Sequence, residues 1–194
     1  MPQYRVIEMS KNIFLSFLFF CLPVVAAAES IGSICSSGVE AAIPATTPTN
    51  QFTFDFEDGE VVTDNKTGLM WSRCPLGYQW EDNTCNYTSD KSMSWMEALD
   101  FVAQNKTAET PHLTYSDWRL PNIKELASII ERRCSEPSVN QYLFGYTAFS
   151  SLSYWSNTHY ISSTDVRVVN YYFGSLHSSS ATNELLVRLV RDVP

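Results

Sequence analysis

The stretch "DWRLPNIKELASIIERRC", Asp117 to Cys134, predicts a strand end, a turn and an amphipathic helix in direct succession. Pro121 favours an extended conformation in the residue before it and so separates the strand from the helix. Asn122 is a typical helix N-cap, and Glu125 stands three residues later, which is the spacing of a capping box. The stretch therefore carries either the backbone of an active site or a frame that supports another part of the molecule.

Apolar residues extend this pattern on both sides of the turn. Trp118 and Leu120 alternate as in a short buried strand. Large aromatic side chains at such positions usually pack inward, so we expect the tryptophans Trp71, Trp95 and Trp118 to lie in the core. The predicted helix presents one apolar face, formed by Ile123, Leu126, Ile130 and Cys134.

The residues before this stretch predict further strands and a second helix. "FTFDF" (residues 52–56) alternates apolar and polar residues, which is typical of a half-buried strand. "VVTDNKTGLMW" (61–71) predicts a strand, an Asp-Asn turn and a second strand. "SMSWMEALDFVAQN" (92–105) has apolar residues at helical spacing, with Ser92 or Ser94 as the N-cap.

The last third of the chain is rich in strand-like segments. These are "SYWSNTHYI" (153–161), "DVRVVNYYFG" (165–174) and "ELLVRLVRDV" (184–193). The serine-rich segment "GSLHSSSATN" (174–183) is interpreted as a turn between the last two of them. Together the elements indicate an α+β fold, with two helices packed on a twisted, mostly antiparallel sheet.

The N-terminal region indicates an exported protein. An apolar run, "NIFLSFLFFCLPVV", follows basic residues and precedes small ones, as in a secretory signal peptide that begins at Met1 or Met9. The segment after it holds few large apolar residues and several prolines, which favours an extended arm. We therefore divide the chain into a signal peptide at residues 1–28, an extended arm at 29–51 and a folded domain at 52–194.

Charge and cysteine content narrow the class of protein. The net charge of −8 argues against nucleic acid and anionic membranes as partners. Four cysteines follow the predicted signal peptide: Cys35, Cys74, Cys85 and Cys134. An even number in an exported chain favours two disulfides, for which three pairings exist. The turn-rich loop between Cys74 and Cys85 favours their pairing, which leaves Cys35 for Cys134; a zinc site is the alternative.

Five ordered motifs resemble a known family. They are "TDNKTGLMWSRC", "SWMEALDF", "DWRLPNIKEL", "YWSNT" and the terminal "VRLVR". Their order and spacing resemble the Lcl C-terminal domain family, which takes its name from bacterial collagen-like adhesins. The resemblance extends from Phe52 to Asp192, so it covers almost all of the predicted domain.

The helices and the stretch between Asp117 and Cys134 are also similar to formylglycine-generating enzymes, which have a C-type-lectin-like scaffold. This resemblance implies that the N- and C-terminal strands, "FTFDF" and "LLVRLVR", are neighbours in the sheet. It also implies that Trp118 and Arg119 lock a strand to a helix. On this interpretation the opening stretch is a frame and not an active site.

The chemistry of those enzymes is not expected in this chain. They carry a reactive, copper-binding cysteine pair late in the fold, whereas no cysteine follows Cys134. The calcium motifs of lectins are only approximated by "EPS" (136–138) and "WSN" (155–157). The acidic run "DFEDGE" (55–60) offers oxygen ligands for calcium but lacks EF-hand spacing. We therefore expect no catalytic residue, no metal and no cofactor, with calcium as the one unsupported alternative.

Aromatic residues in the last third suggest where a ligand would bind. Aromatic faces stack on sugar rings and contribute strongly to protein interfaces, and loops on a rigid sheet often carry binding residues. We therefore predict a shallow recognition surface formed by Tyr154, Asn157, His159, Tyr172 and His177. The alternative is that these aromatic residues complete the core and the polar residues lie in solvated turns. The partner of the surface would be a glycan or a cell-surface or envelope protein, and the chain could form oligomers. Two alternatives remain: an enzyme with a different active site on this scaffold, and a structural subunit of a pilus-like or envelope assembly.

Overall fold

The structure is a computed structural model that describes residues 35, 43–54, 59–104, 113, 115–145, 153–160 and 164–193. The chain divides into two compact units, Met1–Ser30 and Ile31–Pro194, and all described residues belong to the second. The predicted signal peptide and its start site lie outside the described residues. Among the described helices, none is long and apolar enough to cross a membrane.

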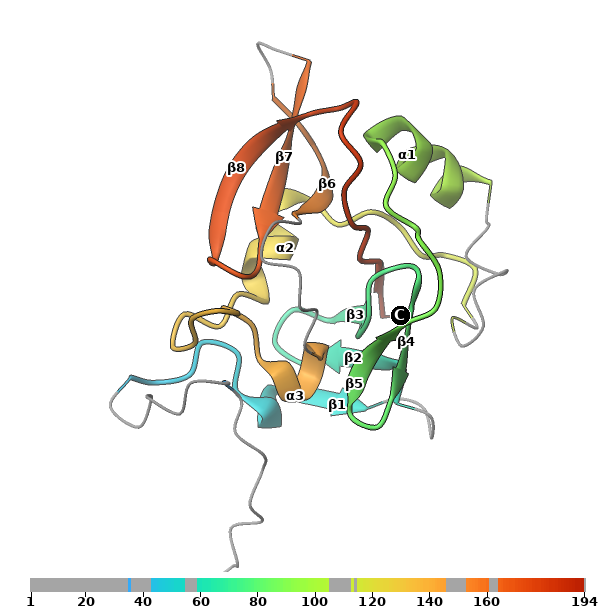
Figure 1. The fold of residues 1–194 in the computed structure, drawn as a ribbon. Coiled ribbons are helices and arrows are strands. Elements are labelled where there is room, and N and C mark those ends of the chain that lie inside the picture. Colours follow the sequence, from blue (N-terminus) through green and yellow to red (C-terminus); the bar gives the residue numbers. More distant parts are fainter. Residues whose placement is uncertain are drawn as a thin grey trace, which may run out of the picture. The chain divides into compact units, whose positions relative to one another are not determined.

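The second unit is α+β and combines three small antiparallel sheets with a few short helices (Figure 1). The helical elements are η1 (Thr49–Gln51), α1 (Trp95–Ala103), α2 (Ile123–Ser128) and α3 (Gln141–Phe144). The strands are β1 (Phe52–Phe54), β2 (Val61–Asp64), β3 (Leu69–Ser72), β4 (Tyr78–Glu81), β5 (Thr84–Tyr87), β6 (Tyr154–His159), β7 (Asp165–Asn170), β8 (Ser175–Ser180) and β9 (Val190–Asp192).

The first and last strands belong to one sheet but are not neighbours in it. The strand order is β1-β2-β3-β9, and β9 pairs with β3 through Trp71 opposite Val190. The expectation that "FTFDF" and "LLVRLVR" pair is therefore wrong. The antiparallel partner of β1 is β2, which in turn pairs with β3, so the edge available to the C-terminal strand is that of β3.

The C-terminal segment 185–192 connects the sheets by changing partner every few residues. Leu185 bridges Met93, and Leu186 bridges Tyr154 at the start of β6. Further along, Val190 bridges Arg119 while its strand pairs with β3. "ELLVRLVRDV" was predicted as one strand, but only Val190–Asp192 is regular because the preceding residues bond to different elements in turn.

The third sheet contains the clearest departure from the sequence prediction. "GSLHSSSATN" was interpreted as a turn, yet Ser175–Ser180 forms β8, paired with β7 over its full length. The turn lies earlier, at residues 171–174, where Gly174 adopts a φ of 63°. Serine has little strand preference of its own, so the pairing with β7 determines the conformation of this segment.

The sheet of β6, β7 and β8 packs against apolar side chains on both faces. Tyr154 and Val169 are paired across β6 and β7 and belong to one core cluster. Trp155 and Val168 are the next pair and belong to a second cluster. Since neighbouring residues point to opposite faces, the first residues of β6 are buried whichever face they take.

The helix of the opening stretch begins as predicted but ends early. Asn122 accepts hydrogen bonds from the N–H groups of Lys124 and Glu125, and the Glu125 carboxylate accepts one from the Asn122 N–H. The predicted capping box is therefore confirmed. The helix ends at Ser128 and does not reach Cys134, because the chain turns there to form a bridge from Ile130 to Val139.

Both predicted disulfides are confirmed, and one of them fastens the arm to the domain. Cys74 bonds to Cys85, and Cys35 bonds to Cys134. The arm is also held by Glu131, whose carboxylate accepts hydrogen bonds from the N–H and hydroxyl groups of Thr46 and Thr47. The described part of the arm is therefore packed against the domain.

Candidate recognition surface

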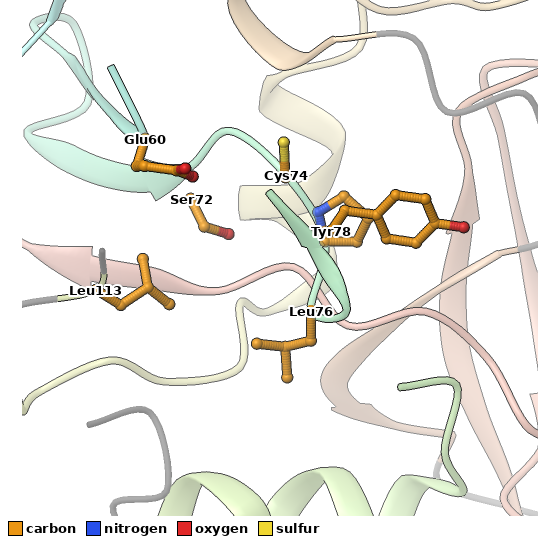
Figure 2. A pocket seen from close by; sticks show the side chains of 7 residues that line it. Glu60, Ser72, Cys74, Leu76, Tyr78 and Leu113 are labelled. Carbon is orange, nitrogen blue, oxygen red and sulfur yellow. The ribbon is translucent and has the colours of Figure 1, made fainter. Parts of the chain in front are cut away.

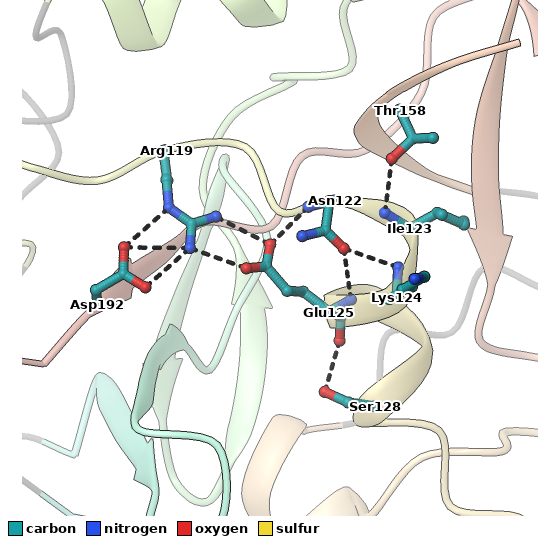
Figure 3. A network of polar contacts seen from close by, with 8 residues as sticks. All are labelled: Arg119, Asn122, Ile123, Lys124, Glu125, Ser128, Thr158 and Asp192. Carbon is teal, nitrogen blue, oxygen red and sulfur yellow. Dashed lines mark hydrogen bonds and ion pairs between the residues drawn. The ribbon is translucent and has the colours of Figure 1, made fainter. Parts of the chain in front are cut away.

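Ion pairs in the stretch from Asp117 to Cys134 join the segment before α2 both to α2 and to β9. Arg119 donates two hydrogen bonds of 2.9 Å to the Glu125 carboxylate on α2 (Figure 3). It also reaches Asp192 on β9 at 3.1 Å. On the neighbouring residues, Arg191 donates to Asp117 at 2.7 Å. These contacts tie the C-terminal strand to the start of α2.

The pKa shifts within these ion pairs indicate a structural role. Hydrogen bonding to Glu125 raises the pKa of the Arg119 guanidinium, and the bond from Arg191 lowers the pKa of the Asp117 carboxyl. Both shifts favour the charged forms, so neither group is prepared to exchange protons with a substrate near neutral pH. Trp118 beside them is 3% exposed and belongs to the second core cluster.

Tyr154 is buried, so the prediction that it lines the recognition surface is wrong. Its side chain is 2% exposed and its ring centroid lies 4.9 Å from that of Tyr171. The buried Arg188 guanidinium lies 5.4 Å from the centre of the Tyr154 ring. The cause is the packing of the β6–β7 sheet on both faces, which leaves no solvent-facing position at the start of β6.

The other four predicted residues divide into two groups. Asn157 and His159 lie near the end of β6, and both side chains are exposed. Tyr172 lies in the turn between β7 and β8, and His177 pairs with Val168 near that turn. Because β6 and β7 are antiparallel, the end of β6 is remote from the β7–β8 turn. Asn157 and His159 therefore lie together at the end of β6, whereas Tyr172 and His177 lie toward the opposite end of the sheet.

Trp95 joins Asn157 and His159 and was missed as a candidate. It was expected in the core but is only partly buried, at the first position of α1. Its indole Nε1 donates a 3.0 Å hydrogen bond to the Ser156 carbonyl, and its ring lies 5.8 Å from that of His159. The signal available in the sequence was its place directly after the N-cap Ser94, at the end of the helix and not in the middle of its apolar face.

We call Trp95, Asn157 and His159 the α1–β6 surface. The indole is held in a fixed orientation by its hydrogen bond and by packing against the second core cluster. The His159 ring is near the indole, and Asn157 follows the Ser156 carbonyl that the indole binds, so both residues can offer donors and acceptors to a ligand there. Such a combination can stack on a flat apolar face and bind polar groups at its rim. It contains no nucleophile activated by a neighbouring base.

Ser153 and His177 form a serine–histidine hydrogen bond in the described part of the chain. The Ser153 hydroxyl and His177 Nε2 are 3.2 Å apart. Ser153 is buried at the start of β6, and no described carboxylate is hydrogen-bonded to His177. The contact therefore lacks the third group that orients the base in hydrolytic triads.

The described residues form a small hollow and a larger one. One, enclosed by Glu60, Ser72, Leu76 and other residues, has a volume of about 20 Å³ (Figure 2). That volume is sufficient for roughly one water molecule. The other, beside α1, measures about 380 Å³ and is lined in part by Glu97, Asp100 and Glu184.

The described residues contain no site that matches the calcium alternative. Among the described residues, no group of three histidine, cysteine, aspartate or glutamate side chains is placed to hold a metal ion. The run "DFEDGE" lies mostly outside the described residues, because only Gly59 and Glu60 are described. Calcium binding at that run stays an untested expectation.

Comparison with known proteins agrees with the motifs. The family model of the Lcl C-terminal domain matches residues 60–191, a span that runs from the start of β2 into β9 and includes the α1–β6 surface. No curated protein sequence matches the chain. Since the match covers more than half of the sequence, the chain belongs to the Lcl C-terminal domain family.

Proposed function

We propose that this protein is an exported, non-catalytic recognition or adhesion module that binds a glycan or a surface protein through the α1–β6 surface. In this proposal residues 1–28 are a signal peptide, residues 29–51 an arm and residues 52–194 a module with a C-type-lectin-like scaffold. Membership of a family named from adhesins supports a role in adhesion. The α+β architecture is compatible with the scaffold.

The observation that carries the proposal is the fixed, partly exposed indole of Trp95. Stacking on a sugar ring requires an aromatic face whose orientation is set before the ligand arrives, because ordering a mobile ring would reduce affinity. The bond from Trp95 Nε1 to the Ser156 carbonyl supplies that order. Asn157 and His159 are exposed beside it and can bind hydroxyl groups of the ligand.

Two disulfides support the exported location. Cys35–Cys134 and Cys74–Cys85 are both formed. Disulfides persist in oxidising compartments and are rare in the cytosol. The module would therefore act in the periplasm, at the cell surface or in the medium, where a glycan or an envelope protein is accessible.

A glycan array with the purified, exported protein tests the proposal. Once a ligand is found, Asn157→Ala and His159→Ala should weaken its binding at least tenfold while the melting temperature changes little. Trp95→Leu should also abolish binding, with some loss of stability because the indole packs against the core.

Tyr172→Ala and Tyr160→Ala serve as matched controls. Tyr172 lies in the β7–β8 turn, while Tyr160 lies beneath the Arg167 guanidinium at 5.9 Å and outside the surface defined above. Both variants should bind as the unchanged protein does. If the controls lose binding while Asn157→Ala and His159→Ala retain it, the α1–β6 surface is not the site.

A further inference from the structure

Strand β8 lies within a long segment that carries no charge. No Asp, Glu, Lys or Arg occurs from Val168 to Asn183, although the chain has a net charge of −8. The strand order β6-β7-β8 places β8 at the edge of its sheet (Figure 1). The strand itself is therefore uncharged on an acidic protein, and the cation beside it is Arg167 of β7, which donates to the Ser178 hydroxyl.

The directions of the main-chain groups of β8 follow from the contacts of β6. Trp155 N–H donates to the Leu186 carbonyl at 3.0 Å, so the main chain of Trp155 points away from β7. Since Trp155 is opposite Val168, the main chain of Val168 points toward β8 and bonds to His177. The residues that alternate with His177 therefore direct their N–H and C=O groups outward. They are Leu176 and Ser178, followed by Ser180, of which only the N–H is available because its C=O accepts the Asn183 N–H at 3.0 Å.

This edge lacks the features by which proteins usually protect exposed strands. Protection comes from short length, proline, charged side chains or a bulge. The six residues of β8 contain no proline and no charge, and their register with β7 is continuous. Two apolar side chains beside the edge are also exposed: Phe173 at 61% and Leu176 at 39%.

We propose that β8 pairs antiparallel with β8 of a second copy of this chain, forming a twofold-symmetric dimer with a continuous six-stranded sheet. Antiparallel pairing of two identical edges is self-complementary, as a twofold axis requires. Two copies with the same negative net charge repel one another, so contact through a strand that carries no acidic residue avoids the largest electrostatic cost. The small serine side chains allow close approach of the two strands.

One register uses the full length of the edge. Outward-facing residues must pair with outward-facing residues, and an axis through Ser178 places Ser178 opposite its own copy and Leu176 opposite Ser180 of the second copy. Phe173 and Leu176 would lose exposed apolar area at the ends of the contact. An interface of this extent is at the small end of the range for specific complexes, so the dimer should depend on concentration.

Sedimentation equilibrium of the exported protein over a wide concentration range tests the proposal. The mean mass should rise from one copy toward two as concentration increases. Ser178→Pro should abolish this rise, because proline removes the outward N–H of Ser178 that must bond across the axis. The pairing of β8 with β7 uses the main-chain groups of the neighbouring residues His177 and Ser179, so the monomer should stay folded.

Ser178→Ala is the matched control, because it keeps the outward N–H and C=O groups and should still form the dimer. Amide hydrogen exchange gives the second measurement: the N–H groups of Leu176 and Ser178 should exchange at least tenfold more slowly at high concentration. A protein that stays monomeric at every concentration overturns the proposal. So does a dimer that persists in folded Ser178→Pro or leaves these two amides unprotected.

Discussion

Arg119 and Glu125 form a bidentate pair in which each terminal nitrogen of the guanidinium lies 2.9 Å from one carboxylate oxygen. The same carboxylate accepts the N–H of Asn122 at 2.7 Å and so completes the helix cap. A single side chain therefore both starts α2 and fastens it to the residue that bridges β9. The pair explains why the stretch from Asp117 to Asn122 can change from extended chain to helix within a few residues.

Removing the arginine should weaken this junction. We expect Arg119→Ala to lower the free energy of unfolding by about 1–2 kcal/mol, a value reduced from that of a buried pair because solvent screens a partly exposed one. The side chain is 34% exposed. Urea unfolding measures the change, with the exposed Lys124→Ala as a control that should differ little. Equal midpoints for both variants would show that the pair contributes nothing.

Trp118 should contribute more to stability than any residue on the protein surface. Trp118→Ala removes a ring that is 3% exposed, and truncation of a large aromatic in a core costs roughly 3–5 kcal/mol. Tyr87→Ala is the comparison, because its ring is 62% exposed. Thermal melting should show a large decrease for the first variant and a small one for the second. A melting temperature unchanged by Trp118→Ala, together with lost ligand binding, would instead identify the stretch as a site.

Apart from the Cys35–Cys134 disulfide, which was obtained by elimination once the short pairing was assigned, the features that sequence predicted correctly are local ones. The capping box depends on Asn122 and Glu125, which are three residues apart, so its signal is complete within one turn of helix. The short disulfide was indicated by the turn-rich loop that it closes. In each case the residues that determine the structure are close together in the chain.

The features that sequence missed depend on distant contacts. Serines form β8 only because β7 pairs with them, and Tyr154 is buried only because both faces of its sheet are covered. Arg188 looked like an ordinary residue of a terminal strand, yet its guanidinium is buried and donates to the carbonyls of Ser72 and Arg73. No local pattern contains these partners, so neither the strand nor the burial could be predicted.

The attachment of the arm should weaken in acid. Burial alone would raise the pKa of the Glu131 carboxyl, but hydrogen bonds from the N–H groups of Thr46, Thr47 and Arg133 outweigh it and lower the pKa below 4.5. A carboxyl with a lowered folded-state pKa stabilises the fold above its unfolded pKa and loses that contribution as pH falls through the folded value. Stability should therefore decrease below about pH 4.5.

Glu131→Gln separates this effect from general acid denaturation. The amide keeps the shape of the side chain but does not titrate, so the variant should be less stable at neutral pH and should lose part of the acid dependence. Thermal melting from neutral to acidic pH, compared with the unchanged protein, gives the difference. Parallel pH profiles for the two proteins would show that Glu131 is not responsible.

The two disulfides should differ in what they contribute, because they close loops of very different length. Cys35 and Cys134 are separated by 99 positions, and Cys74 and Cys85 by 11. If the bonds act by restricting the unfolded chain, loss of the long link should cost roughly 2 kcal/mol more than loss of the short one. Paired Cys→Ser variants for each bond, unfolded in urea, measure both costs.

The long link has a further consequence that the short one lacks: it holds the arm near Glu131, so its removal should also speed proteolysis between Cys35 and Thr46. Trp80 forms a small core cluster with Cys74 and Cys85. A larger loss from the Cys74–Cys85 pair would mean that packing in this cluster, and not chain entropy, determines the contribution of these bonds.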